Sequence, residues 1–269
     1  MAAELVFSNK PKWLLRLNDS RLMIKRSSRH ILRNTDQLLG AFFQPIMFLV
    51  LFASVFGGSI SKALPPGVSY INFLMAGIIV QTVAFGSTTT AVSVCSDLKK
   101  GIVDRFRSLP MANLAVLNGH VTSDIFRNAI STTVMLLAGL AIGFRPHANF
   151  VEWLQIVGIL LLFTYSFSWL SAIVGVIAKS VEAVQWLTFV IIFPLTFAST
   201  AFVPSAGMGK YLKAFAVNQP ITQVVEAIRA LILGNPIGNH GWLAAAWSLG
   251  ILVISMPLAS TMFRNKTSS

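Results

Sequence analysis

The chain has 269 residues, of which 55% are hydrophobic and only 11% are charged, and its mean hydropathy is +0.71. Because soluble domains carry about 25% charged residues, this composition excludes an ordinary soluble globular protein and predicts a membrane protein. The net charge of +12 is better explained by basic loops at a membrane face than by nucleic-acid binding, which we do not expect. The single cysteine, Cys95, excludes an internal disulfide and a CxxC metal or haem site.

The amino-terminal segment has a basic helical pattern. Arg21, Lys25, Arg29 and Arg33 recur every four residues, and apolar residues occupy other parts of the same helical surface. We expect residues 10–35 to form an interfacial amphipathic helix that lies on an anionic leaflet. The alternative is a loosely ordered basic tail.

Six windows are long and apolar enough to cross a membrane, which needs about 20 residues per helix. They run from Leu38 to Gly57, Ile71 to Cys95, Ile125 to Phe144, Trp153 to Ala178, Ala183 to Val203 and Trp242 to Phe263. The first is full length and lacks a small-residue cleavage site, so we expect a retained span rather than a cleavable signal peptide. The prediction is an all-α polytopic membrane protein with one transmembrane domain over residues 1–269.

A seventh apolar segment, Ile221 to Gly234, has only fourteen residues and is too short to cross. Its apolar residues share one helical face, and Glu226 and Arg229 can pair at the border of that face. Pro220 suits the first turn of such a helix. We therefore expect short re-entrant or interfacial helices on the extracellular side, within residues 204–240, that dip into the outer leaflet without crossing.

The distribution of Lys and Arg predicts the orientation, since cytoplasmic loops carry the excess. With six spans and a cytoplasmic amino terminus, sixteen of the twenty-one basic residues lie inside, including Arg127. Lys62, Lys210 and Arg229 are among the few outside. This predicts a multi-pass protein of the prokaryotic plasma membrane with both termini in the cytoplasm.

The predicted spans have no ionisable residue near their middle, which weighs against an ion-coupled carrier. The four histidines are scattered near span borders with no HExxH motif and no catalytic triad spacing, so we expect neither a metal site nor an enzyme. A GxxxxGK[ST] motif is also absent from the sequence, which means that any ATP used must bind another polypeptide.

Aromatic and mildly polar residues in the spans offer a path for a hydrophobic ligand, since such sites are mostly apolar with few polar groups. The alternative for each of them is packing or lipid contact. The candidates for this path are Phe42, Phe43, Phe85, Thr88, Phe189, Phe193 and Phe197.

The stretch between the second and third predicted spans, "SDLKKGIVDRFRSLPMA" (residues 96–112), is unusually polar. Apolar residues spaced by four, four and three form one stripe, and neighbouring acidic and basic side chains can pair along the rest of the helix. Pro110 then disfavours further helix. We expect a short amphipathic helix that docks a cytoplasmic partner; the alternative is a loop resting on headgroups.

This stretch, with "DRFRSLPMANLAVLNG" after the second span and "NQPITQVVEAIRALILG" before the last one, resembles type-2 ATP-binding-cassette (ABC) permeases, in particular the daunorubicin-resistance group of exporters. The resemblance covers essentially the whole chain. It differs at "SDLKK", where relatives often have a Glu-rich run, so docking would use different charge pairs here.

The resemblance implies a non-catalytic permease subunit that forms a homodimer or heterodimer and docks ABC ATPase subunits, which carry ATP and Mg; this chain itself binds no cofactor. It implies export of a hydrophobic or amphipathic drug, antibiotic or lipid, by movement transmitted through the loop helix. The residues that would couple the ATPase are Asp97, Lys100, Ile102, Asp104, Arg105, Phe106 and Leu109. The alternatives are an ATP-independent carrier or channel and a membrane scaffold subunit.

Overall fold

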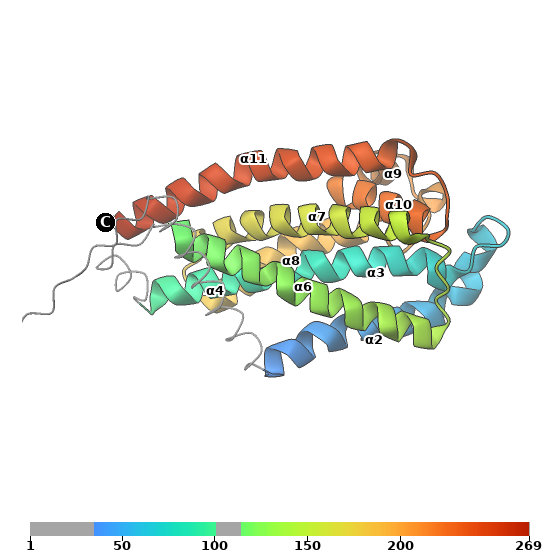
Figure 1. Cartoon of the computed structure of the whole chain (residues 1–269), viewed down its shortest axis with the longest axis horizontal. Helices are drawn as coiled ribbons and strands as arrows, with labels where there is room; N and C mark the ends of the chain where they lie inside the picture. Colours follow the sequence, from blue (N-terminus) through green and yellow to red (C-terminus); the bar gives the residue numbers. More distant parts are fainter. Residues whose placement is uncertain (1–34, 101–113, 269) are drawn as a thin grey trace, which may run out of the picture.

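The computed structural model describes residues 35–100 and 114–268, with side chains from 43–100 and 116–267, and all of its regular elements are helical (Figure 1). The predicted all-α class is confirmed for these residues. The interfacial helix expected over residues 10–35 lies almost entirely outside the described residues, and so does the loop stripe from Ile102 to Leu109.

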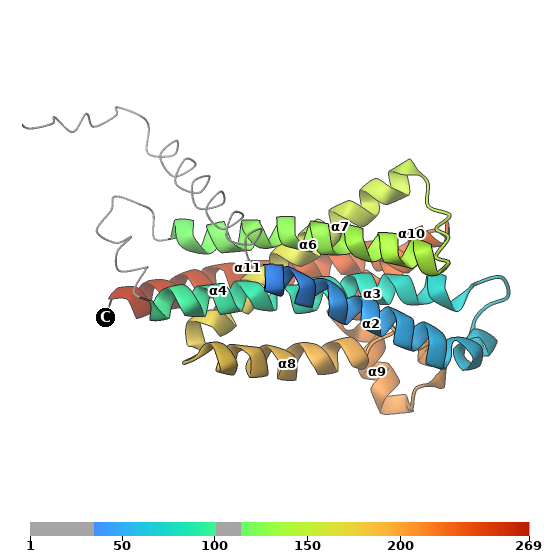
Figure 2. The same ribbon diagram turned by 90° about the horizontal axis from the view of Figure 1, so that it is seen from below.

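In the described part of the chain the long helices make six rods, one of which is broken into two helices. The rods run back and forth along the long axis of the molecule (Figures 1 and 2). The elements of these rods are α2 (Thr35–Ile60), α3 (Tyr70–Gly86), α4 (Thr88–Lys99), α6 (Leu114–Ile142), α7 (Phe150–Ile177), α8 (Val181–Phe197) and α11 (Gly238–Ser268). The connections at one end hold the short helices η1 (Ser61–Ala63), η2 (Ser205–Gly207), α9 (Lys210–Asn218) and α10 (Pro220–Ile232). The carboxyl terminus and the end of α4 lie at the opposite end (Figure 1).

Five stretches of the described residues are long and apolar enough to cross a membrane, and α3 and α4 together make one of them. The remaining rod, α8, is apolar but has only 17 residues. The boundaries differ most for the third span, which was expected to start near residue 125, because α6 already begins at Leu114. Similarly, α8 ends at Phe197 rather than near residue 203, three residues after the internal Pro194.

Helix α3 is the centre of the bundle and is buried along most of its length, whereas α2 is largely exposed. Small residues bring neighbouring backbones close to this central rod, as they do in many membrane bundles. A methyl group added at Gly77 would lie 2.1 Å from the Ala201 carbonyl oxygen, and one added at Gly175 would lie 2.4 Å from that of Ala91. The two glycines therefore set the approach of α3 to the chain after α8 and of α7 to α4.

The fourteen-residue apolar segment forms α10, which packs against α3, α7 and α11. Its predicted apolar face is buried, as shown by Ile221, Val224, Val225, Ile228, Leu231 and Ile232. Pro220 occupies the first turn as expected, and Gly234, with φ of +70°, ends the segment in a conformation that favours glycine. This helix is thus an integral part of the bundle end rather than a surface element.

Arg229 fastens α10 to the bundle. Its Nη1 donates to Glu226 at 2.7 Å, which confirms the predicted pair. Its Nε donates to the Phe73 carbonyl oxygen at 3.2 Å and its Nη2 to that of Thr200 at 2.7 Å. The guanidinium also lies 3.6 Å from the centre of the Phe73 ring, in a cation–π contact. A single buried side chain therefore joins α10, α3 and the segment after α8.

Replacing Arg229 with methionine should destabilise the protein by about 3 kcal/mol, because it leaves carbonyl oxygens and a carboxylate without their charged donor. Thermal unfolding of the purified protein in detergent measures the loss. The matched control is Lys213→Met on α9, where the chain is exposed and little change is expected. Equal unfolding temperatures for Arg229→Met and the control would contradict the role assigned to Arg229.

Candidate functional site

The rod formed by α3 and α4 is interrupted at Ser87. The Ser87 hydroxyl donates to the Ala84 carbonyl oxygen at 2.7 Å and lies 2.8 Å from the Ser171 hydroxyl of α7. Side-chain hydroxyls that bond to backbone carbonyls in this way compete with helical hydrogen bonds and bend helices. Gly86 beside it also brings the backbone against α6, since an added methyl would lie 2.1 Å from Asn128 Oδ1. The interruption thus lies in the interior of the bundle, and Ser87 keeps a right-handed helical backbone conformation there.

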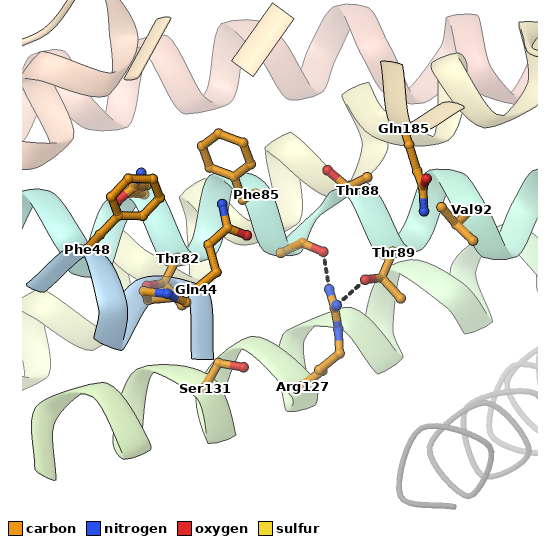
Figure 3. A pocket seen from close by; sticks show the side chains of 13 residues that line it. Gln44, Phe48, Thr82, Phe85, Thr88, Thr89, Val92, Arg127, Ser131 and Gln185 are labelled. Carbon is orange, nitrogen blue, oxygen red and sulfur yellow. Dashed lines mark hydrogen bonds between the residues drawn. The ribbon is translucent and has the colours of Figure 1, made fainter. Parts of the chain in front are cut away.

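A buried ion pair on α6 faces this break. Arg127 donates hydrogen bonds to the Gly86 carbonyl oxygen and to the Thr89 hydroxyl (Figure 3). It also donates to Asp124 on its own helix. The Ser168 hydroxyl of α7 donates to the other carboxylate oxygen of Asp124. The Arg127 side chain is only 6% exposed and the Asp124 side chain only 2%. The pair therefore holds α6 against both halves of the broken rod and against α7.

This pair corrects the expectation that no ionisable residue lies near the middle of a span. Both Asp124 and Arg127 fall within the candidate span Val116–Ile142, and Arg127 is near the middle of α6. The predicted span started at Ile125, so Asp124 fell outside it and Arg127, two residues inside its start, was counted as a cytoplasmic charge. Buried charges in such segments face the bundle interior and mark functional sites by default. The lack of ionisable residues near the middle of the spans therefore no longer weighs against an ion-coupled carrier.

A cavity of about 380 Å³ lies beside the break, and four of the rods contribute to its wall. This volume is within the range of small-molecule sites. Figure 3 shows Phe48 and Phe85 toward one end of it and Arg127 with Thr89 toward the other. Its lining comprises Gln44, Pro45 and Phe48 of α2; Gln81, Thr82, Phe85 and Gly86 of α3; Thr88, Thr89 and Val92 of α4; Arg127 and Ser131 of α6; and Gln185 of α8.

The structure brings some of the predicted path residues to this cavity but not all. Phe85 and Thr88 line it. Phe189, Phe193 and Phe197 form a ladder along α8, with consecutive ring centres 4.9 and 4.2 Å apart, and the Phe197 ring lies 6.0 Å from that of Phe48. The ladder thus ends against the cavity's aromatic end, although its three members are not part of the lining.

The remaining two candidates for the path lie on α2. Phe43 is 71% exposed and does not line the cavity. The side chain of Phe42 lies outside the described part of the chain. Sequence reasoning also passed over Gln81, Arg127 and Gln185, which do line it. For Gln81 the signal was available, because a glutamine within an apolar span is costly unless it has a partner.

Gln81 stands out in the lining because it is 3% exposed and neither of its amide atoms has a hydrogen-bond partner among the described residues. An unsatisfied buried polar group costs about 1 to 3 kcal/mol, so such groups are uncommon in folded proteins. Gln81, Phe85, Thr88 and Val92 are spaced by four, three and four, so they follow one face of the rod despite the break. This face can present both polar and aromatic groups to one ligand.

A second feature is an acidic–histidine pair that joins the end of α4 to the start of α6, the two helices that flank the polar loop. Asp97 at the end of α4 pairs with His120 near the start of α6, with 3.0 Å between the carboxylate oxygen and the ring nitrogen Nε2. Lys100, which follows α4, is exposed. The five other residues expected to couple an ATPase lie outside the described residues, so the pair shows only that the two stems of the loop are joined. His120 was not predicted.

The described residues hold no group of three or more histidine, cysteine or acidic side chains that could bind a metal ion. The cavity instead combines an aromatic end, several neutral polar groups and one internally neutralised ion pair. Such a lining fits a mainly apolar molecule with a few hydrogen-bonding groups.

Comparison with known proteins agrees with these features. The family model for ABC-2 type transporters matches residues 19–233. The chain is 30% identical over 230 residues to the daunorubicin resistance ABC transporter permease protein DrrB1 of Streptomyces coeruleorubidus, with 86% of this chain and 80% of that protein covered. It is 25% identical over 241 residues to the probable doxorubicin resistance ABC transporter permease protein DrrC of Mycobacterium tuberculosis, with 84% and 82% covered.

A putative transport permease, ycf38 of Porphyra purpurea, is 25% identical over 208 residues, covering 77% of this chain and 71% of that protein. The family match extends over well more than half of the sequence and includes the broken rod, the buried ion pair and α10. The chain therefore belongs to the ABC-2 type transporter family and is a membrane permease homologous to the daunorubicin and doxorubicin resistance permeases.

Proposed function

We propose that this chain is the permease subunit of an ABC exporter that moves a hydrophobic or amphipathic compound out of a prokaryotic cell, driven by ATP hydrolysis on a separate subunit. The observation that carries the proposal is the cavity beside the α3–α4 break, with its aromatic end and its neutral polar groups. The names of the drug-resistance relatives favour a drug or antibiotic as the substrate.

Energy would reach the cavity through α4, which contributes to the cavity wall and continues to the polar loop. We assign docking of the ATPase to this loop. Rigid helices transmit small movements between sites, and the link between Asp97 and His120 keeps the two stems of the loop together. The partners are then two ABC ATPase subunits, which bind ATP and Mg, and a second permease chain, identical or related.

The test is ATP-driven transport by the reconstituted complex. The chain is co-expressed with an ABC ATPase as its nucleotide-binding partner and placed in liposomes, and daunorubicin movement is followed with and without ATP. Transport that needs both the ATPase and ATP is expected. Full transport by the chain alone would favour the ATP-independent carrier or channel, and a stable complex that moves none of a panel of amphipathic drugs would favour the scaffold subunit.

The proposed topology has six crossings with both termini in the cytoplasm, so α8 crosses despite its 17 residues. The alternating course of the rods supports an even number, because it brings the carboxyl terminus to the end that holds the polar loop (Figure 1). Lys62 and Lys210, near the opposite end, are then extracellular.

Single-cysteine labelling checks this topology in a Cys95→Ser background. Cysteines at positions 62 and 210 should react with an impermeant maleimide in intact cells, whereas one at position 266 should react only after permeabilisation. If a cysteine at position 210 reacted only after permeabilisation, the six crossings would be contradicted. The extracellular location assigned to α10 would then also be wrong.

A further inference from the structure

Gln81 is a buried amide without a partner in the wall of the cavity. It is 3% exposed, it lines the cavity, and both its Nε2 and its Oε1 lack hydrogen bonds to the described residues. Asn72, the other amide side chain on this rod, is satisfied, since it makes two hydrogen bonds to the backbone of Arg145, at 3.0 and 2.9 Å. Buried polar groups are nearly always bonded to protein, water or a ligand. Gln81 is therefore available to bond to an occupant of the cavity.

The electrostatics of the wall indicate the charge of that occupant. Among the described residues that line the cavity, Arg127 is the one ionisable side chain, and Asp124 neutralises it within the protein. Its terminal nitrogens are already occupied by Asp124, Gly86 and Thr89, and its Nε alone has no partner among the described residues. A charged ligand group would therefore find no free opposite charge to offset its loss of hydration. An uncharged polar group meets no such cost when it bonds to a glutamine amide.

The opposite end of the cavity indicates the body of the occupant. Phe48 and Phe85 lie there (Figure 3), and Phe48 belongs to a larger aromatic cluster with Phe52 and Phe197, at 6.1 and 6.0 Å between ring centres. Offset or tilted ring contacts at such distances are favourable between aromatic groups. A flat ring system fits this end better than a flexible lipid chain. It can make ring contacts with the same side chains, and it has no alkyl torsions whose conformational entropy is lost on binding.

We propose that the cavity binds an uncharged aromatic compound whose ring system lies against Phe48 and Phe85 and whose carbonyl or amide group bonds to the side chain of Gln81. The glutamine Nε2 donates to the carbonyl oxygen of the ligand, and its Oε1 accepts from a neighbouring N–H or O–H group. This inference names the substrate-binding residue of the exporter and so depends on the proposed function.

The test uses two matched probes and measures binding without ATP or transport. The full-length protein in lipid nanodiscs is titrated with 2-anthracenecarboxamide and with 2-methylanthracene, and empty nanodiscs are subtracted. Gln81→Leu should weaken carboxamide binding about tenfold, the loss of one hydrogen-bonded group, and change methylanthracene binding less than twofold. The control Gln155→Leu, an exposed position on α7 outside the cavity, should change neither.

The folded state is checked by thermal unfolding, which Gln81→Leu should leave unchanged or raise, because it removes an unsatisfied buried amide. Saturable carboxamide binding to the unmodified protein is required, and its absence would overturn the proposal. So would equal effects of Gln81→Leu on both probes, or no effect on either, which would mean that the amide serves packing or an ordered water molecule.

Failure of this inference and failure of the export function are distinguishable. If the probes bind as expected but the complex with its ATPase transports nothing, the export function is wrong and the site is kept. If the complex with its ATPase transports an uncharged amphipathic drug in an ATP-dependent way while Gln81→Leu leaves carboxamide affinity unchanged, the export function stands and the binding residue assigned here is wrong.

Discussion

Replacing Asp124 with leucine should destabilise the protein by about 3 to 5 kcal/mol. The change leaves Arg127 buried without its counter-charge, and arginine cannot lose its proton to avoid the cost. The Ser168 hydroxyl would also lose its acceptor. We expect the purified variant to unfold at a clearly lower temperature in detergent and to accumulate poorly in the membrane.

The matching double replacement separates the charge from the packing. Asp124→Leu with Arg127→Met removes both charges while keeping similar volumes, and replacing a whole buried pair with apolar residues is often close to neutral. The double variant should therefore be more stable than Asp124→Leu alone, with a coupling energy of about 2 kcal/mol or more in the double-mutant cycle. A double variant as unstable as the single one would mean that the pair does not hold α6 to the broken rod.

Replacing Phe106 with alanine should weaken binding of the ATPase about 30-fold and abolish ATP-driven transport. Phe106 is the centre of the apolar stripe predicted for the polar loop, and truncation of an aromatic anchor buried in a partner typically costs about 2 kcal/mol or more. Asp104→Lys and Arg105→Glu should have smaller effects, since charges at the rim of an interface contribute less.

The matched control is Phe126→Ala on α6, where the ring is 56% exposed and outside the loop. Pull-down with the ATPase and transport in liposomes are measured on the same preparations. The control should resemble the unmodified protein in both assays. If Phe106→Ala also keeps full ATPase affinity and transport, the loop rests on the membrane and docks nothing.

Composition and periodicity were sufficient to predict the helical membrane fold and the course of α10. A protein surrounded by lipid must satisfy its backbone hydrogen bonds internally, so long apolar windows become helices whatever their neighbours are. For α10 the apolar residues recur at helical spacing, and Glu226 lies one turn before Arg229, so its buried face and its internal ion pair depend on local order in the chain.

The candidate site was only partly accessible from the sequence. Phe85 and Thr88 were selected because the second predicted span is aromatic and polar there, and both line the cavity. The aromatic residues of α8 were selected on the same ground, but they pack as a ladder outside the lining. The direction that each ring takes depends on which rods are neighbours, and hydropathy along one chain contains no such information.

The tertiary structure alone decided the role of the residues around the helix break. Arg127 counts as a cytoplasmic charge when the third span is started at Ile125, yet α6 starts earlier and carries Arg127, paired with Asp124 on the same helix, to Gly86 and Thr89 of the broken rod. Likewise, Gln81 resembles any polar packing residue until its lack of a partner is seen. The sequence by itself determined where helices form, because that depends on local hydrogen bonding and burial. The hydrogen-bond partners of a buried side chain on other helices, and the set of residues that line the cavity, depend on contacts between residues far apart in the chain. Such contacts exist only once the rods have packed.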